Sequence, residues 1–122
     1  MRATLTDLKN NPSLDPKVIV LDNDKIVIKR GSAVKKEKFR PIFKDGEELW
    51  VFTFEGERST ISREHVILVW NEEARKYRII NKATNSRTLI NRRVLSSGKA
   101  AWLEDKDTLQ LGEEVVFLIR YN

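Results

Sequence analysis

The residues best suited to binding an anion lie in one stretch of the chain, Ser59 to Val69. Its first half is polar and contains Ser62 and Arg63, and at His65, the only histidine of the protein, it gives way to an unbroken apolar run. An arginine presents a planar set of N–H donors and a serine adds a hydroxyl, which together suit a phosphate or a carboxylate. Because a core strand fixes what the preceding loop presents, we expect this stretch to be the functional centre.

The composition leaves little material for catalysis or metal binding. With one histidine and no cysteine, the chain lacks the parts of a thiol nucleophile, a disulfide, a thiolate metal site or a histidine-dependent zinc mechanism. No phosphate-cradling glycine loop and no paired-carboxylate motif stands out, and the adjacent glutamates read as solvated turn residues. We therefore expect no catalytic residue, no metal and no cofactor, and we do not predict an enzyme.

No apolar run approaches the roughly 20 residues needed to cross a bilayer, and the N-terminal segment lacks the apolar region of a signal peptide. The absence of cysteine also favours a reducing compartment. We expect a soluble intracellular protein with no membrane partner.

Basic residues are unevenly distributed. The net charge is +5, from 23 basic and 18 acidic residues. Between Lys29 and Lys44 there are seven basic residues against Glu37 alone, and between Lys82 and Lys99 there are five more and no acid. Such an uneven field indicates an anionic partner, although an ordinary solvated loop would also explain the first segment.

At 122 residues, the chain has the size of one domain. We read residues 1–17 as an N-terminal extension with at most a short helical turn, because they are polar and interrupted by prolines. The folded domain is expected over residues 18–122, with a basic insertion at about 31–48 that forms a long loop and a small strand over Phe39 to Phe43.

Short β-branched and aromatic runs alternate with turn residues through this domain, and no segment has a long helical period. The pattern predicts an all-β sandwich of short strands. Two hairpins are expected, one joining Val18–Leu21 to Ile26–Ile28 and one turning at residues 91–93. The three tryptophans adjoin apolar strand residues, so we expect them in the core: Trp50, Trp70 and Trp102.

Four motifs in order resemble those of the forkhead-associated (FHA) domain. Ser62-Arg63-Glu64-His65 resembles the SRxH signature, and residues 84–91 resemble the SxNGTxxN loop. Residues 103–112 resemble the LxxGDxIxLG segment, and Ile26 to Arg30 resembles the strand that ends in a Gly-Arg pair. Together these motifs cover about Val18 to Tyr121.

The resemblance implies an FHA-type β-sandwich of about eleven strands, whose loops at one end bind a phosphothreonine peptide. It implies that Arg30, Ser62 and Arg63 contact the phosphate. The resemblance also implies that Asn85, Ser86 and Arg87 hold the peptide beside the phosphate. It also implies structural support of the site by three further residues: His65, Thr88 and Asn91.

The chain departs from the family pattern at several positions. Lys29 replaces the glycine before the phosphate-binding arginine, and Ser86-Arg87 replaces the Asn-Gly pair. Arg87 thus occupies a position where glycine usually permits a positive φ, which predicts a reshaped loop. Lys106-Asp107 replaces the Gly-Asp turn, and Ser62 follows Arg30 by 32 positions, which implies an insertion between strands.

We accordingly predict a phosphothreonine-dependent recognition module of signalling, DNA-damage or cell-cycle assemblies, nuclear in a eukaryote and cytoplasmic in a bacterium. Its partner would be a phosphothreonine-containing protein. One alternative is nucleic-acid binding through Lys29 to Lys44 with Arg87, Arg92 and Arg93, and another is phosphate-independent protein binding on the same fold. The oligomeric state and the role of the insertion stay open.

Overall fold

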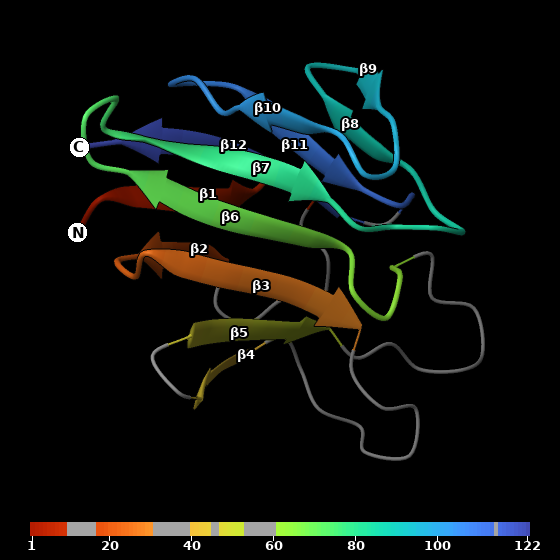
Figure 1. Cartoon of the computed structure of the whole chain (residues 1–122), viewed down its shortest axis with the longest axis horizontal. Helices are drawn as coiled ribbons and strands as arrows, with labels where there is room; N and C mark the ends of the chain where they lie inside the picture. Colours follow the sequence, from red (N-terminus) through yellow and green to blue (C-terminus); the bar gives the residue numbers. More distant parts are fainter. Residues whose placement is uncertain (10–16, 31–39, 45–46, 53–60, 114) are drawn as a thin grey trace.

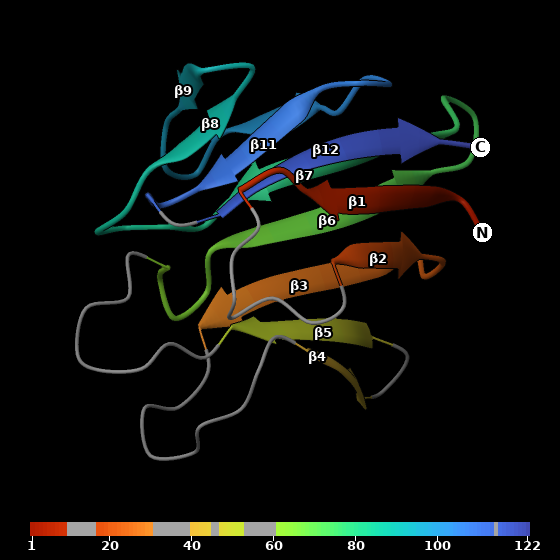
Figure 2. The same ribbon diagram turned by 180° about the vertical axis from the view of Figure 1, so that it is seen from behind.

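The computed structural model describes residues 1–9, 17–30, 40–44, 47–52, 61–113 and 115–122, which form two sheets packed face to face (Figures 1 and 2). The described residues contain twelve strands: β1 (Ala3–Asp7), β2 (Val18–Leu21), β3 (Lys25–Arg30), β4 (Arg40–Lys44), β5 (Glu47–Phe52), β6 (Val66–Asn71), β7 (Lys76–Asn81), β8 (Thr88–Ile90), β9 (Arg93–Leu95), β10 (Ala100–Trp102), β11 (Thr108–Leu111) and β12 (Val115–Tyr121). This arrangement confirms the predicted all-β sandwich.

The strands divide equally between the two sheets. The first sheet has the order β2-β1-β12-β11-β8-β9, and the second has the order β10-β7-β6-β3-β5-β4. All pairs are antiparallel except β3 with β5, which run parallel with Ile28 opposite Trp50. Because β3 also pairs with β6, its last residue, Arg30, is held at the end of the sandwich where β6 begins.

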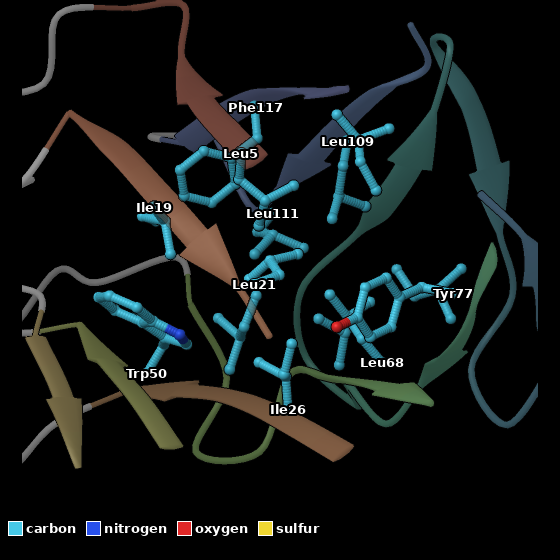
Figure 3. Close-up of a cluster of buried hydrophobic side chains, with 14 of the residues drawn as sticks. Leu5, Ile19, Leu21, Ile26, Trp50, Leu68, Tyr77, Leu109, Leu111 and Phe117 are labelled. Carbon is cyan, nitrogen blue, oxygen red and sulfur yellow. The ribbon is translucent and has the colours of Figure 1, made fainter. Parts of the chain in front are cut away.

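The core lies between the two sheets (Figure 3). Side chains along a strand point alternately to its two faces, so alternate residues become buried. In β12, for example, Val115, Phe117 and Ile119 are fully buried while the residues between them are partly exposed. Tyr77 and Phe117 are the largest of the fully buried side chains. The core thus fixes the strand ends from which the loops emerge.

The prediction of an N-terminal extension over residues 1–17 is wrong for its first part. Ala3–Asp7 forms β1, which lies between β2 and β12 in the first sheet. Ala3 and Leu5 are buried in the core, and Leu5 lies opposite Ile19 and Ile119 in the two neighbouring strands. The remainder of the predicted extension, residues 10–16, lies outside the described residues.

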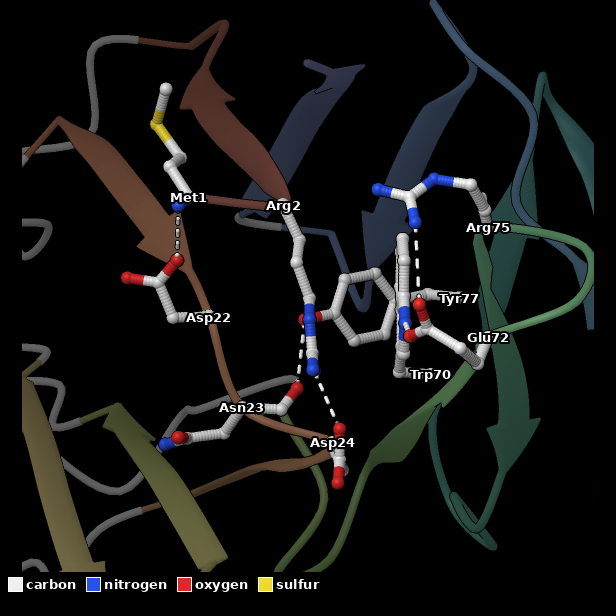
Figure 4. A network of polar contacts seen from close by, with 9 residues as sticks. All are labelled: Met1, Arg2, Asp22, Asn23, Asp24, Trp70, Glu72, Arg75 and Tyr77. Atoms are coloured by element: carbon white, nitrogen blue, oxygen red, sulfur yellow. Dashed lines mark hydrogen bonds and ion pairs between the residues drawn. The ribbon is translucent and has the colours of Figure 1, made fainter.

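The prediction that Val18–Leu21 and Ile26–Ile28 form a hairpin is also wrong, because β2 and β3 belong to different sheets. The turn between them crosses the sandwich edge and is fixed by polar contacts (Figure 4). Tyr77 donates its hydroxyl to the Asn23 carbonyl at 2.8 Å, and Arg2 Nη1 pairs with Asp24 Oδ1 at 2.7 Å. Burial raises the pKa of Tyr77 to about 12, so the phenol stays a donor.

The second predicted hairpin, at residues 91–93, is confirmed as β8–β9. Its two loop residues, Asn91 and Arg92, have φ of 50° and 67°, as a two-residue type I′ turn requires. A strand does lie in the predicted insertion, at Arg40–Lys44, and pairs with β5. Residues 47–48 of the predicted insertion begin β5, and its remaining residues, 31–39 and 45–46, lie outside the described residues.

The three tryptophans differ in burial. Trp50 is buried and Trp70 packs partly buried against the core, but Trp102 is 41% exposed. The prediction of a core position is therefore wrong for Trp102. On β10 it is Ala101 that packs against the core, so its neighbour Trp102 points to the outer face, beside Arg78 of β7.

A left-handed backbone occurs at Lys106, where the FHA pattern has glycine. It does not occur at Arg87, which also replaces a glycine of that pattern and where we predicted a reshaped loop. Lys106 has a φ of 69°, and Arg87 is not among the described residues with positive φ. A side chain in this region costs roughly 1 kcal/mol relative to glycine.

We expect Lys106→Gly to raise the free energy of unfolding by up to about 1 kcal/mol, because it relieves this backbone strain. Arg87→Gly is the matched control and should lower it by about 0.5 kcal/mol, since it adds only disorder to the unfolded chain. Urea denaturation measures both. If Lys106→Gly and Arg87→Gly lowered the free energy of unfolding equally, the backbone strain assigned to Lys106 would be contradicted.

Candidate functional site

The six predicted phosphopeptide-binding residues line one pocket at the end of the sandwich opposite the chain termini (Figure 1). The pocket has a volume of about 730 Å³. Its walls come from the end of β3, the loop before β6, the loop from β7 to β8 and the turn after β11. The predicted residues in it are Arg30, Ser62, Arg63, Asn85, Ser86 and Arg87.

His65 joins two of these loops from behind the pocket. Its ring is fully buried, accepting the Ser62 backbone N–H at Nδ1 at 3.1 Å and donating from Nε2 to the Arg87 carbonyl at 3.1 Å. Its own backbone bonds to Ile28 and Lys82. Both ring nitrogens are therefore used by a neutral imidazole, and burial lowers the pKa of His65 to about 4.

The loops also meet through two serine hydroxyls. Ser62 Oγ lies 2.7 Å from Ser86 Oγ. A hydroxyl carries one hydrogen and can rotate, so this pair uses one hydrogen between the two oxygens and leaves the other for a ligand. The Arg30 backbone N–H donates to the Ser62 carbonyl at 3.1 Å, which places the end of β3 against the same loop.

The charges around the pocket favour an anion. Four cationic side chains line it, Arg30, Arg63, Lys82 and Arg87, against Glu64 and Glu113. Arg63 and Arg87 are exposed, and the three arginines form no side-chain ion pair with another described residue. Arginines without a carboxylate partner keep their N–H donors for a ligand.

One residue that holds the site together was missed by the sequence analysis. Asn81 is 2% exposed at the end of β7. It accepts from the Ala83 N–H at 3.0 Å and the Thr88 hydroxyl at 2.8 Å, and donates to the Leu95 carbonyl at 2.7 Å. The alternation of Tyr77, Ile79 and Asn81 along β7 was the available signal, because it places the amide on the inward face.

The three predicted supporting residues do not all lie at the pocket. His65 and Thr88 contact its loops, as described above. Asn91 lies at the β8–β9 turn instead, where its amide donates to Asp107 at 2.7 Å and accepts from the Thr108 N–H at 2.9 Å. Lys82, Glu64 and Glu113 line the pocket and were not predicted to do so.

Within the part of the chain that the structure describes, no cluster of histidine, cysteine or acidic residues could hold a metal ion. Across the same residues, no helix has the length and apolarity to span a membrane.

Comparison with solved structures shows what this fold is similar to. The N-terminal FHA domain of Rad53p from S. cerevisiae, solved in complex with a phosphothreonine peptide, matches with a TM-score of 0.67 at 11% identity, over 100% of this chain and 94% of that one. The FHA domain of the CT664 protein from Chlamydia trachomatis matches with a TM-score of 0.64 at 14% identity, over 100% and 99% of the two chains. The FHA domain of an Arabidopsis thaliana hypothetical protein matches with a TM-score of 0.66 at 16% identity, over 98% and 85%.

At the sequence level, no curated protein matches the chain. The family model of the FHA domain, in contrast, matches residues 46–112, which is just over half of the 122 residues. This match includes Ser62, His65 and the loop from Lys82 to Arg87, and it agrees with the fold. The chain belongs to the FHA domain family.

Proposed function

We propose that this chain is a phosphothreonine-dependent recognition module for a protein or peptide. The observation that carries the proposal is the convergence of three arginines and a pair of serine hydroxyls on one pocket. A phosphothreonine carries about −1.5 to −2 charges and three acceptor oxygens, so it needs several donors around one point. FHA domains are generally recognition modules, and the Rad53p relative holds a phosphothreonine peptide.

Each group has a defined role in this proposal. Arg30 and Arg63 supply guanidinium donors to the phosphate, and Ser62 supplies its hydroxyl. Ser86 positions the Ser62 hydroxyl, while Asn85 and Arg87 flank the peptide backbone. If the pocket buries the threonine methyl group, that burial is worth about 0.8 kcal/mol over phosphoserine, about fourfold in affinity.

The cellular setting stays a prediction. Signalling, DNA-damage and cell-cycle assemblies are the expected contexts, in the nucleus of a eukaryote or the cytoplasm of a bacterium. The similar structures come from yeast, plant and bacterial proteins, so the setting has to be measured for this chain.

Fluorescence anisotropy with a phosphothreonine peptide library tests the function directly. We expect Arg30→Ala to weaken the selected peptide about 10- to 100-fold and Ser62→Ala about tenfold, since charge-assisted hydrogen bonds contribute about 1.5–3 kcal/mol each. Arg75→Ala is the matched control, because Arg75 lies in the turn after β6, pairs with Glu72 (Figure 4) and does not line the pocket.

The same peptides without phosphate and with phosphoserine complete the experiment. Phosphate-independent binding, or affinity unchanged in both the Arg30 and Ser62 variants, would contradict the proposal. Binding of single-stranded nucleic acid in place of every phosphopeptide would favour the polyanion alternative, whose affinity should fall steeply with salt. The three arginines that we assigned to nucleic-acid binding lie at two separate places. Arg87 lines the pocket, whereas Arg92 and Arg93 lie at the β8–β9 hairpin.

A further inference from the structure

A second concave surface lies between strands β9 and β10, each of which is an edge strand of its sheet. Among the described strands, β9 pairs only with β8, and β10 pairs only with β7. The groove between the two edges has a volume of about 540 Å³ and shares no lining residue with the pocket described above. We call it the β9–β10 groove.

The floor of the β9–β10 groove is apolar. Ile90, Leu95 and Ala101 line it and are partly buried, packed against the core. Val94 of β9 and Trp102 of β10 also line the groove and are exposed, at 60% and 41%, with Trp102 on the outer face of its sheet. Exposed apolar surface around a concavity marks a site of interaction, and tryptophan is among the residues that contribute most to binding when covered.

The charge on the lining of the groove is positive, with an acidic neighbour, Asp107, which the lining residue Asn91 contacts at 2.7 Å. Arg93 lines it, and the guanidinium of Arg78 lies 5.7 Å from the centre of the Trp102 ring. No lining residue is acidic, and neither arginine forms an ion pair with another described residue. An occupant that brings carboxylates would therefore find cationic partners at the groove and no repulsion from its lining.

We propose that the β9–β10 groove binds an extended acidic peptide segment that carries bulky apolar side chains. In an extended segment, alternate side chains point to opposite sides, so apolar residues can lie on Ile90, Leu95 and Ala101 while the intervening carboxylates reach Arg93 and Arg78. The unpaired outer edges of β9 and β10 offer backbone groups to such a segment. This site needs no phosphate and is independent of the function proposed above.

The test is an NMR titration of the 15N-labelled chain with an unphosphorylated eight-residue peptide in which aspartate and leucine alternate. We expect shifts at the Trp102 indole N–H and the backbone of residues 93–95, and none at residues 62–65 or 84–87. Trp102→Ala, Val94→Asp and Arg93→Glu should each weaken binding at least tenfold. Val20→Asp is the matched control, because Val20 is also an exposed valine on an edge strand, at 43%, on β2, and should leave affinity unchanged.

The retained dispersion of each variant's spectrum shows that it is folded. Exchange of aspartate for asparagine in the peptide should weaken binding at least tenfold, and so should raised salt. The proposal is overturned if millimolar peptide leaves Trp102 and residues 93–95 unshifted, or if the asparagine peptide binds equally well. It is also overturned if oligothymidylate, and not the peptide, shifts these resonances, since the groove would then serve nucleic acid.

Discussion

Between pH 7 and pH 4.5, the domain is expected to lose about 2 kcal/mol of unfolding free energy through His65 alone. The folded state holds this imidazole neutral down to about pH 4, whereas an unfolded chain protonates it near pH 6.5. Below pH 6.5 the unfolded state therefore binds a proton that the folded state rejects. The stability that the neutral His65 contributes is fully present above pH 6.5. It is lost as the pH falls from 6.5 to 4, and no further loss is expected below pH 4.

The loss should be accompanied by weaker ligand binding, because protonation places a hydrogen on Nδ1, which now accepts from the Ser62 N–H. Two donors would then face each other behind the pocket, and the Ser62 loop would have to move. Urea denaturation across the pH range gives the stability change, and anisotropy with the selected phosphopeptide gives the affinity.

His65→Gln is the control variant, because glutamine keeps an acceptor and a donor but does not titrate. The difference between the two proteins isolates His65 from other groups, which matters because burial raises the pKa of Glu48. As the pH falls, the raised pKa of Glu48 increases the free energy of unfolding, because the folded state takes up the Glu48 proton at a higher pH than the unfolded chain does. Parallel pH profiles for the two proteins would show that His65 does not control the acid transition.

Asn81→Ala is expected to lower the free energy of unfolding by about 3 kcal/mol, as large an effect as any single polar change at this site. The substitution removes three hydrogen bonds inside the protein and leaves the Ala83 N–H, the Thr88 hydroxyl and the Leu95 carbonyl without this partner. Each buried group left unsatisfied costs about 1–3 kcal/mol, partly offset by relaxation. Because two of the three groups lie in the loop that ends at Thr88, phosphopeptide affinity should fall as well.

Asn85→Ala provides the comparison for stability. Asn85 is an exposed amide in the same loop, and exposed substitutions usually change stability by less than about 0.5 kcal/mol. Urea denaturation at pH 7 measures both variants. If Asn81→Ala were no more destabilising than Asn85→Ala, the hydrogen bonds of Asn81 would not be what fixes the loop.

The fold class and six of the residues that line the pocket were predictable because each depends on local signals. β-branched runs separated by turn residues indicate strands, and four ordered motifs place their loops at the same end of a known fold. Arg30 and Ser62 are 32 positions apart in sequence, yet both come to the pocket because β3 and β6 pair with Ile28 opposite Val66.

The errors concern pairing over long distances. The run from Ala3 to Asp7 contains only two inward apolar residues, and its strand conformation depends on β12, at the other end of the chain. The turn at residues 22–24 looks like a hairpin locally, but contacts from Tyr77 and Arg2 hold it as a crossing between sheets. No window around either segment contains the partner that decides its structure.

The exposure of Trp102 was unpredictable for a related reason. In a three-residue edge strand, Ala100–Trp102, the sequence does not define which alternate face turns inward. Only the register with β7, with Ala101 opposite Ile79, assigns the tryptophan to the outer face.

The pairing of β1 with β12 has a consequence for the order in which the protein can fold as it is synthesised. β1 is made before the other described strands of the domain, but its neighbour β12 (Val115–Tyr121) is made after all of them. During translation, β1 and β2 can pair only with each other, and an isolated two-stranded unit has marginal stability at best. The second sheet can be completed as soon as β10 leaves the ribosome, because it needs nothing after Trp102. We therefore expect the inner face of the second sheet to remain uncovered until β12, the last strand of the first sheet, has been made, so that the pairing of β12 completes the domain.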